Sequence, residues 1–346
     1  MIALHHRLLR RFALLLSLNL GVFGCSGHHD QSLTSVRIGW QVPLATQGQI
    51  VQVLKRTDLL ESYGLQGVFV PFSYGGPQTE AALAGELDVI FVGDQPAVNL
   101  IARGGKWKIV SRLFYTKTAI MVPPNSLVHS IADLRGKTVA SPFGSVAHRE
   151  AILKQRASGL DPDKDVQNVN LDILEISNVV QAGGDRSWGK IDAVAVWEPS
   201  TSLFELRKMA RIVDFTRTLG VVAVSDEFLA QHREPAVRFL AATLDAWAYF
   251  ATHTSEVNQW YIADAHLAYT PDVLDSAARV EPNYAARSFK DIDLRLTDDH
   301  IATLGAAAAW ANERGFAKAK VEMLPAVDLS LLEQAALHAG KHSRPR

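Results

Sequence analysis

From residue 36 onward, short apolar runs rich in β-branched residues alternate with longer segments whose apolar residues recur at helical spacing. A short apolar run bounded by turn residues is typical of a buried strand, and alternation with helical patterns indicates βα units on a parallel sheet. In the first series we predict strands at residues 36–40, 68–70, 88–92 and 109–114, and helices at residues 47–56, 79–84 and 97–102. This series predicts an α/β lobe.

A second series of the same kind begins at residue 137. It predicts strands at residues 137–140, 171–176 and 193–197, and helices at residues 146–156 and 203–209. Two further β-rich runs, residues 118–122 and 220–224, flank this series on either side. After about residue 227 the pattern is mostly helical, with predicted helices at residues 235–250, 255–266, 271–279 and 299–314.

The two series contain matching segments. Residues 85–92 read Gly-Glu-Leu-Asp-Val-Ile-Phe-Val, and residues 189–196 read Gly-Lys-Ile-Asp-Ala-Val-Ala-Val. In each segment the glycine can end a helix in the left-handed conformation, and the aspartate opens a buried strand. One short match is weak evidence of duplication, but its equivalent position in both series favours two similar Rossmann-like lobes.

The two flanking β-rich runs predict how the lobes are connected. If both runs cross between the lobes, the second lobe is an insertion and the paired strands form a hinge. We therefore predict a first lobe of residues 36–120 plus 222–346 and a second lobe of residues 121–221. The alternative is one long doubly wound domain.

The first residues have the pattern of an export signal. A basic stretch precedes the mostly apolar residues 12–23, which are too few to span a membrane. The run ends before Cys25, which is the only cysteine of the chain. This ending resembles the lipobox of bacterial lipoproteins, although Phe23 stands where a small residue is usual. We predict a lipoprotein-type signal peptide over residues 1–25, lipidation at Cys25 and a linker over residues 26–35. The alternative is an ordinary signal peptide with a coincidental cysteine.

Composition excludes several classes of protein. The chain of 346 residues carries 35 Lys and Arg against 36 Asp and Glu, a formal net charge of −1, so no basic field indicates nucleic-acid binding. A single cysteine excludes an intramolecular disulfide and a cysteine-rich metal cluster. His338 and His342 have helical metal-ligand spacing, but they lie in a basic tail, and we predict no metal and no cofactor. Because the common catalytic motifs are also missing from the sequence, we expect a binding protein and no enzyme.

The repeat predicts where a ligand binds. Ligands of open α/β sheets sit beyond the carboxyl ends of the strands. There the first lobe presents Gly93 and Asp94, and the second presents Trp197 and Glu198, with Glu198 at the repeat position of Asp94. The alternative for both carboxylates is helix capping, which suits Asp94 as well as a ligand contact does but suits Glu198 poorly.

Three other segments carry candidate ligand contacts. Gly144 and Ser145 lead from a strand into a helix, whose unpaired amide groups and dipole attract an anion, and His148 lies in the first turn of that helix. The alternative there is a serine-capped helix with an exposed histidine. Glycines permit close approach of a ligand to the backbone, which makes Gly76 and the adjoining Pro77 candidates, and the amide of Gln41 follows the first strand directly.

Together these segments resemble the bacterial ABC-transporter substrate-binding proteins of the aliphatic sulfonate, taurine and nitrate group. The resemblance rests on the order and spacing of residues 37–41, 75–77, 93–96, 131–137, 144–148 and 191–199. It implies a type II periplasmic-binding fold, a ligand between the lobes, a periplasmic location, and ABC permease and ATPase subunits as partners. The sequence departs from the family at Glu198, where Asp is usual, and at Ser200, where an aromatic residue is usual.

The family resemblance and the candidate residues suggest a ligand. We expect a small organic anion, either taurine or an alkanesulfonate, and the carboxylates of Asp94 and Glu198 favour a zwitterion such as taurine over nitrate because they suit an ammonium group. Nitrate or bicarbonate offers no cation for Glu198, and a pyrimidine-type vitamin precursor that stacks on Trp197 is a further alternative. Other classes are an enzyme with the same cleft and a sensor lipoprotein outside transport. We expect a monomer that meets the membrane through its lipid anchor.

Overall fold

The computed structural model of this chain describes residues 33–265, 267–317 and 320–340. The predicted signal peptide, the lipidation site at Cys25 and most of the 26–35 linker lie outside the described residues, as does His342. None of the helices in the described part of the chain combines the length and the apolar composition that crossing a membrane requires.

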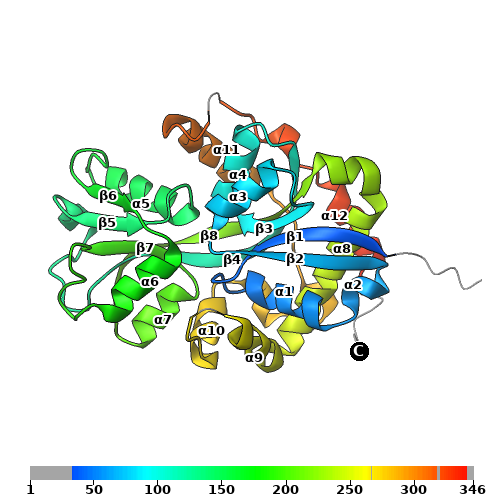
Figure 1. Cartoon of the computed structure of the whole chain (residues 1–346), viewed down its shortest axis with the longest axis horizontal. Helices are drawn as coiled ribbons and strands as arrows, with labels where there is room; N and C mark the ends of the chain where they lie inside the picture. Colours follow the sequence, from blue (N-terminus) through cyan, green and yellow to red (C-terminus); the bar gives the residue numbers. More distant parts are fainter. Residues whose placement is uncertain (1–32, 266, 318–319, 341–346) are drawn as a thin grey trace, which may run out of the picture. The chain divides into compact units, whose positions relative to one another are not determined.

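The described residues contain one mixed sheet whose strand order is β2-β1-β3-β8-β4-β7-β5-β6 (Figure 1). The strands are β1 (Thr34–Gln41), β2 (Leu65–Phe72), β3 (Val89–Gly93), β4 (Trp107–Val122), β5 (Thr138–Ser141), β6 (Gln167–Asn170), β7 (Ala193–Trp197) and β8 (Arg211–Ser225). Strands β1, β2 and β3 pair in parallel at one end of the sheet, and β5, β6 and β7 pair in parallel at the other.

The long strands β4 and β8 connect the two ends of the sheet. They pair antiparallel along nearly their whole length, while β3 pairs with the end of β8 and β7 with the end of β4. We call the part built on β1, β2 and β3 lobe one, and the part built on β5, β6 and β7 lobe two. This arrangement confirms the predicted fold of two α/β lobes joined by two strands. The predicted boundary residues of the lobes stay predictions.

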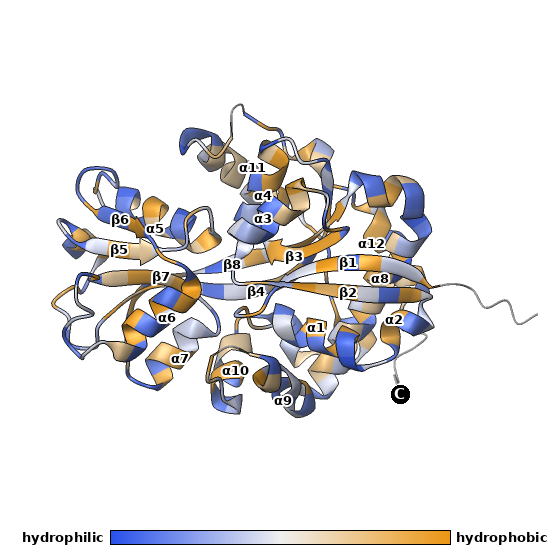
Figure 2. Cartoon of the chain, in the orientation of Figure 1, coloured by the Kyte–Doolittle hydropathy of each residue, from blue (hydrophilic) through white to orange (hydrophobic). Residues whose placement is uncertain are grey.

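One correction concerns β4, for which the sequence predicted separate strands at residues 109–114 and 118–122. They form a single strand of 16 residues with register irregularities along it. The apolar pattern breaks at residues 115–118 because this stretch crosses between the lobes, where Thr116 and Thr118 are buried polar residues and Tyr115 and Lys117 are partly exposed. Strands β4 and β8 turn hydrophilic there, whereas β3 and β7 stay apolar (Figure 2).

The internal repeat is visible in the hydrogen bonds. The carboxylate of Asp88 accepts the amide hydrogen of Arg37 at 2.8 Å, and that of Asp192 accepts the amide hydrogen of Thr138 at 2.9 Å. Each aspartate thus fixes the start of one strand against the first strand of its lobe. The preceding glycines, Gly85 and Gly189, both have positive φ, at 76° and 70°, as the sequence predicted.

Helices cover both faces of the sheet (Figure 1). They are α1 (Gln47–Arg56), α2 (Leu59–Ser62), α3 (Gly75–Leu83), α4 (Asp94–Ala102), α5 (Val146–Ala157), α6 (Ile173–Ala182), α7 (Ser200–Leu206), α8 (Asp226–Thr252), α9 (Thr254–Asp264), α10 (Pro271–Ala278), α11 (Asp298–Glu313) and α12 (Ser330–His338). Short 3-10 turns lie at Ile131–Leu134, Pro282–Ala285, Phe289–Asp291 and Leu324–Ala326.

The predicted strand at residues 171–176 is wrong, because this segment opens helix α6. A capping box starts the helix: Asp172 accepts the amide hydrogen of Leu174 at 2.8 Å, and Glu175 accepts that of Asp172 at 2.8 Å. The strand of this βα unit is β6, which lies just before the apolar run. A short apolar run fits a strand or a helix equally, and here the capping residues decide in favour of the helix.

Candidate ligand-binding site

A small pocket lies between the two lobes, bounded by the hinge strands. Its polar lining consists of Gln41, Thr116, Thr118, Ser145 and Thr218, and its apolar lining of Leu44, Pro96, Phe114, Val146, Trp197 and Leu219, with Gly75 and Gly93 between them. These residues come from both lobes and from β4 and β8. The space open to the centres of water molecules is about 30 Å³.

Four of the predicted ligand contacts line this pocket: Gln41, Gly93, Ser145 and Trp197. They belong to β1, β3, the start of α5 and β7, so the carboxyl ends of strands from both lobes meet here as expected. The side chain of Trp197 is only 5% exposed, and its indole nitrogen donates to the carbonyl of Pro43 at 3.1 Å. Its polar atom is therefore occupied, and the indole offers the pocket an apolar surface.

Gly76 and Pro77 lie in the first turn of α3, which begins earlier than the predicted residue 79. Neither lines the pocket, but Gly75 does. A Cβ atom on Gly75 would lie 2.3 Å from Cγ of Pro96, so the glycine lets α3 approach α4 closely. Gly75 therefore allows the starts of α3 and α4 to lie close together at the edge of the pocket.

Ser145 is the N-cap of α5, as the anion-site hypothesis requires. Its hydroxyl oxygen accepts the amide hydrogen of His148 at 3.2 Å. The amide groups of Val146 and Ala147 precede the intrahelical hydrogen bonds, and the helix dipole places partial positive charge at this end. This is the local arrangement that binds anions at helix starts.

His148 does not line the pocket, and its ring is buried at 3% exposure. The ring stacks on Phe143 with centroids 4.2 Å apart and meets the edges of Trp310 and Phe316 from lobe one. Nδ1 accepts the amide hydrogen of Gly144 at 3.2 Å, so Gly144, also predicted as a ligand contact, uses its amide within the protein. Burial lowers the pKa of His148 to about 4, and the charge of Arg314 adds to the effect. The imidazole is thus neutral near pH 7 and brings no positive charge to an anion.

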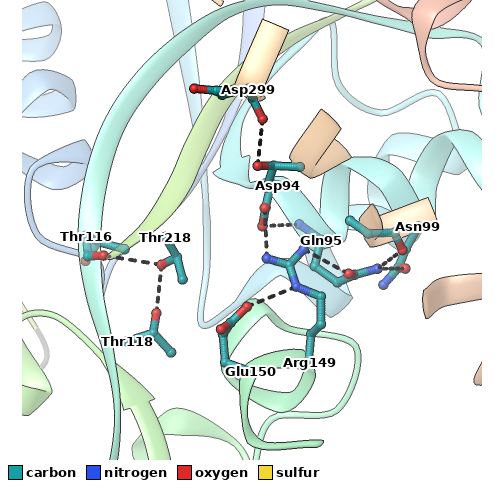
Figure 3. Close-up of polar contacts among 11 residues, drawn as sticks. Asp94, Gln95, Asn99, Thr116, Thr118, Arg149, Glu150, Thr218 and Asp299 are labelled. Atoms are coloured by element: carbon teal, nitrogen blue, oxygen red, sulfur yellow. Dashed lines mark hydrogen bonds and ion pairs between the residues drawn. The ribbon is translucent and has the colours of Figure 1, made fainter. Parts of the chain in front are cut away.

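Asp94 does not line this pocket either. Its carboxylate lies 2.9 Å from the guanidinium of Arg149, on α5 of lobe two, and both side chains are almost fully buried (Figure 3). The same guanidinium donates to Gln95 at 3.1 Å and to Glu150 at 3.3 Å. The carboxylate predicted to face the ligand instead joins the two lobes.

The carboxylate of Glu198 is likewise paired within the protein. The carboxylate is 1% exposed, lies 3.1 Å from the Lys117 ammonium and accepts hydrogen bonds from the amide and hydroxyl of Ser202 at 3.0 and 2.9 Å. Like Asp94, it is not among the residues that line the pocket. The two carboxylates predicted to hold an ammonium group are each neutralised by a cation of the protein.

The sequence analysis missed three threonines on the hinge strands. Thr116, Thr118 and Thr218 all line the pocket, and Figure 3 shows them side by side on β4 and β8. The hydroxyls of Thr118 and Thr218 are 2.8 Å apart, and that of Thr218 also lies 3.3 Å from the carbonyl of Thr116. The available signal was the alternation of Thr116 and Thr118 within a β-rich stretch, which puts both on one face of a strand.

Among the described residues, no three His, Cys, Asp or Glu side chains are grouped so that they could share a metal ion.

Comparison with solved structures identifies the fold. The structure is similar to the alkanesulfonate-binding protein SsuA from Xanthomonas axonopodis pv. citri bound to MOPS, with a TM-score of 0.70, 21% identity and coverage of 86% of this chain and 98% of that one. It is also similar to the periplasmic nitrate-binding protein NrtA from Synechocystis PCC 6803, with a TM-score of 0.70, 13% identity and 89% coverage of both chains. The fold is therefore that of the periplasmic binding proteins.

Comparison of the sequence with protein families identifies the family of this chain. The family model "NMT1/THI5 like" matches residues 75–257, just over half of the chain, and the chain belongs to this family. A protein of Bacillus subtilis (strain 168) named "Putative aliphatic sulfonates-binding protein" is 25% identical over 322 residues, covering 91% of this chain and 92% of that protein.

Proposed function

We propose that this chain is the solute-binding component of an ABC importer and that it takes an organic sulfonate into the pocket between its lobes. The observation that carries the proposal is the pocket itself. It combines an anion-binding helix start at Ser145 with an apolar wall that includes Phe114 and Trp197. An amphiphilic anion fits both halves of this lining, and the names of the Bacillus and Xanthomonas relatives point to the same chemistry.

The charges around the pocket favour a monoanion. No Lys, Arg, His, Asp or Glu is among its lining residues, so an anion is held by hydroxyl, amide and helix-dipole groups alone. Neutral donors compensate a single spread charge better than two charges, because burying an uncompensated charge costs several kcal/mol. We therefore expect binding of alkanesulfonates and weak binding of sulfate.

The pairing of the two carboxylates also ranks the two expected sulfonates. Taurine needs an acceptor for its ammonium group, but Asp94 and Glu198 are held by Arg149 and Lys117. An alkyl chain instead finds Leu44, Phe114 and Trp197. We accordingly place alkanesulfonates ahead of taurine.

Burial of the pocket lining indicates movement of the lobes. Gln41, Ser145 and Trp197 are 4%, 2% and 5% exposed, and they come from both lobes. The described conformation is therefore closed around the pocket, and entry of a ligand requires the lobes to separate. Strands β4 and β8 are the connection around which such hinge movement occurs.

The cellular setting follows from the resemblance and the N-terminal sequence. We propose a periplasmic monomer that delivers its ligand to permease and ATPase subunits without chemical change. Lipid on Cys25 would hold it at the membrane. Fractionation tests the anchor: Cys25→Ser should move the mature protein into the soluble fraction, and equal membrane retention of the variant would remove the lipoprotein proposal.

Calorimetry on the purified protein tests the ligand. The panel contains 1-propanesulfonate, taurine, sulfate, nitrate and a hydroxymethyl pyrimidine. We expect 1-propanesulfonate to bind most tightly and to be recovered unchanged after incubation, whereas turnover would identify an enzyme. Ser145→Ala should weaken it, since the helix cap and a hydroxyl donor are lost together. Failure of every sulfonate to bind would overturn the proposal.

The pyrimidine is a second candidate because of one observation. A pocket without charged lining and with the indole of Trp197 also suits a neutral aromatic ring. Tight binding of the pyrimidine with no binding of 1-propanesulfonate would transfer the proposal to that ligand.

A further inference from the structure

We propose that the hydroxyl group of Thr116, in hinge strand β4, binds the anionic group of the ligand directly. This inference rests on the proposed function and deepens it, because it assigns a ligand contact to the strand that connects the lobes. Each candidate contact at a strand end or a helix start lies in only one of the two lobes. A contact from β4 would instead bind the ligand to the strand that connects the lobes.

The first observation concerns the side-chain hydroxyl group of Thr116. The residue is 7% exposed and lines the pocket, and its hydroxyl oxygen has no hydrogen-bond partner within the described part of the chain. Buried hydroxyl groups are nearly always paired, because leaving one unpaired costs free energy. A ligand oxygen in the pocket would supply the missing partner.

The second observation comes from counting protons on the neighbouring threonines. Each hydroxyl has one proton to donate. If Thr218 donates to the carbonyl of Thr116, then the 2.8 Å contact between Thr118 and Thr218 uses the proton of Thr118. Both protons are then committed within the protein. Thr116 is left as the threonine of this group with a proton free for the ligand.

The third observation is that two other side chains around the pocket also have a proton free to donate. The hydroxyl of Ser145 accepts from His148, which leaves its own proton free. The side-chain nitrogen Nε2 of Gln41 donates one of its two hydrogens to the side-chain oxygen of Gln78 at 3.0 Å, and its second hydrogen remains free to donate. Donors from lobe one, lobe two and the hinge thus surround the same small space. A sulfonate presents three equivalent oxygens, one for each donor.

An unpaired buried hydroxyl alone does not indicate a ligand site. The hydroxyl of Ser111, on the same strand, is also buried without a partner among the described residues, but Ser111 does not line the pocket. The position of Thr116 at the pocket is what separates the two residues. Ser111 therefore provides a matched control.

The experiment compares Thr116→Val, Thr116→Ser and Ser111→Ala with the wild type. Valine keeps the shape of threonine and removes the hydroxyl group. Calorimetry with 1-propanesulfonate measures Kd, and thermal unfolding of the ligand-free proteins measures stability. We expect Thr116→Val to raise Kd about tenfold or more, as for loss of a hydrogen bond to a charged group. Thr116→Ser and Ser111→Ala should keep Kd near the wild-type value.

The thermal measurement distinguishes ligand binding from a structural role. Removing an unpaired buried hydroxyl leaves the ligand-free protein as stable as before or more stable, so the midpoint of Thr116→Val should not fall. A parallel loss of stability and affinity would mean that the hydroxyl supports the fold, and would overturn the proposal. So would a Kd for Thr116→Val within about twofold of the wild type, less than any hydrogen bond to a charged group contributes.

A crystal structure of the wild-type complex with 1-propanesulfonate gives an independent answer. A sulfonate oxygen within about 3.0 Å of the Thr116 hydroxyl is expected. A sulfonate bound elsewhere in the pocket would overturn this inference while leaving the proposed function intact. If the wild type binds no sulfonate at all, the proposed function fails and this role of Thr116 fails with it.

Discussion

The carboxylate of Asp94 and the guanidinium of Arg149 form an ion pair 2.9 Å long that joins the start of α4 in lobe one to α5 in lobe two. Beside it, the amide of Asn99 donates to the carbonyl of Gly144 at 3.0 Å, again from lobe one to lobe two. On another side of the pocket, Trp197 of lobe two donates to Pro43 of lobe one. The lobes are therefore held together by the protein's own polar groups, whose contacts must break when the lobes open for ligand entry.

The ion pair predicts a large effect of a small substitution. Asp94→Asn removes the closer of the two carboxylates that pair with the buried Arg149 and leaves only Glu150, so the free energy of unfolding should fall by about 2 kcal/mol or more. Urea denaturation measures this loss. The control is Glu322→Gln, which removes an exposed ion pair with Lys320 and should change stability by less than about 0.5 kcal/mol. Equal effects of the two substitutions would mean that the buried ion pair contributes no more to the free energy of unfolding than the exposed one.

Glu198 gives a prediction about selectivity. Because its carboxylate is paired with Lys117 and Ser202, Glu198→Gln should lower stability by a few kcal/mol. The ratio of the dissociation constants for taurine and 1-propanesulfonate should stay the same, since the carboxylate does not line the pocket. Calorimetry on the variant with both ligands checks this. A selective loss of taurine binding would show that the carboxylate reaches the ligand's ammonium group after all.

His148 predicts a dependence of stability on pH. Its pKa falls from 6.5 to about 4 on folding because of burial, with Arg314 lowering it further and Asp163 opposing. Between these values the unfolded chain binds a proton that the folded chain does not. The free energy of unfolding should therefore be unaffected by His148 above pH 6.5 and should fall as the pH drops toward 4, by roughly 3 kcal/mol in all.

Urea denaturation at pH 7 and pH 4.5 measures this contribution, with His148→Phe as the comparison. Phenylalanine keeps an aromatic ring among Phe143, Trp310 and Phe316 and removes the titrating group. The wild type should lose more stability than the variant on acidification. Identical losses would assign the acid sensitivity to other groups.

Gly75 predicts a steric effect at the edge of the pocket. In Gly75→Ala the new methyl group would meet the rigid ring of Pro96, so α3 and α4 must move apart. Overpacking of this kind costs about 1 to 3 kcal/mol, and the affinity for sulfonate should fall because both residues line the pocket. Gly305→Ala in α11 is the control, since it meets open space and should stabilise its helix by about 0.5 to 1 kcal/mol. Unchanged stability and affinity of Gly75→Ala would contradict the close-approach argument.

Local patterns in the sequence determined much of the fold. The helix predicted at residues 47–56 has those bounds, and the repeated glycine and aspartate predicted equivalent strand starts at Asp88 and Asp192. Such features depend on the spacing of neighbouring residues, which sequence alone contains. The helix at residues 173–182 was missed although its capping residues, Asp172 and Glu175, were also local and readable.

The positions of the strand ends were predictable as well, and with them Gln41, Gly93, Ser145 and Trp197 as lining of one pocket. Only the tertiary structure decided what the charged side chains do there. Arg149 lies 55 residues from Asp94, and its guanidinium reaches that carboxylate only once the lobes are packed together. The same holds for Thr116 and Thr218, which are 102 residues apart. Whether a polar group faces a ligand depends on which distant partner is already beside it, and no spacing within the sequence encodes that distance.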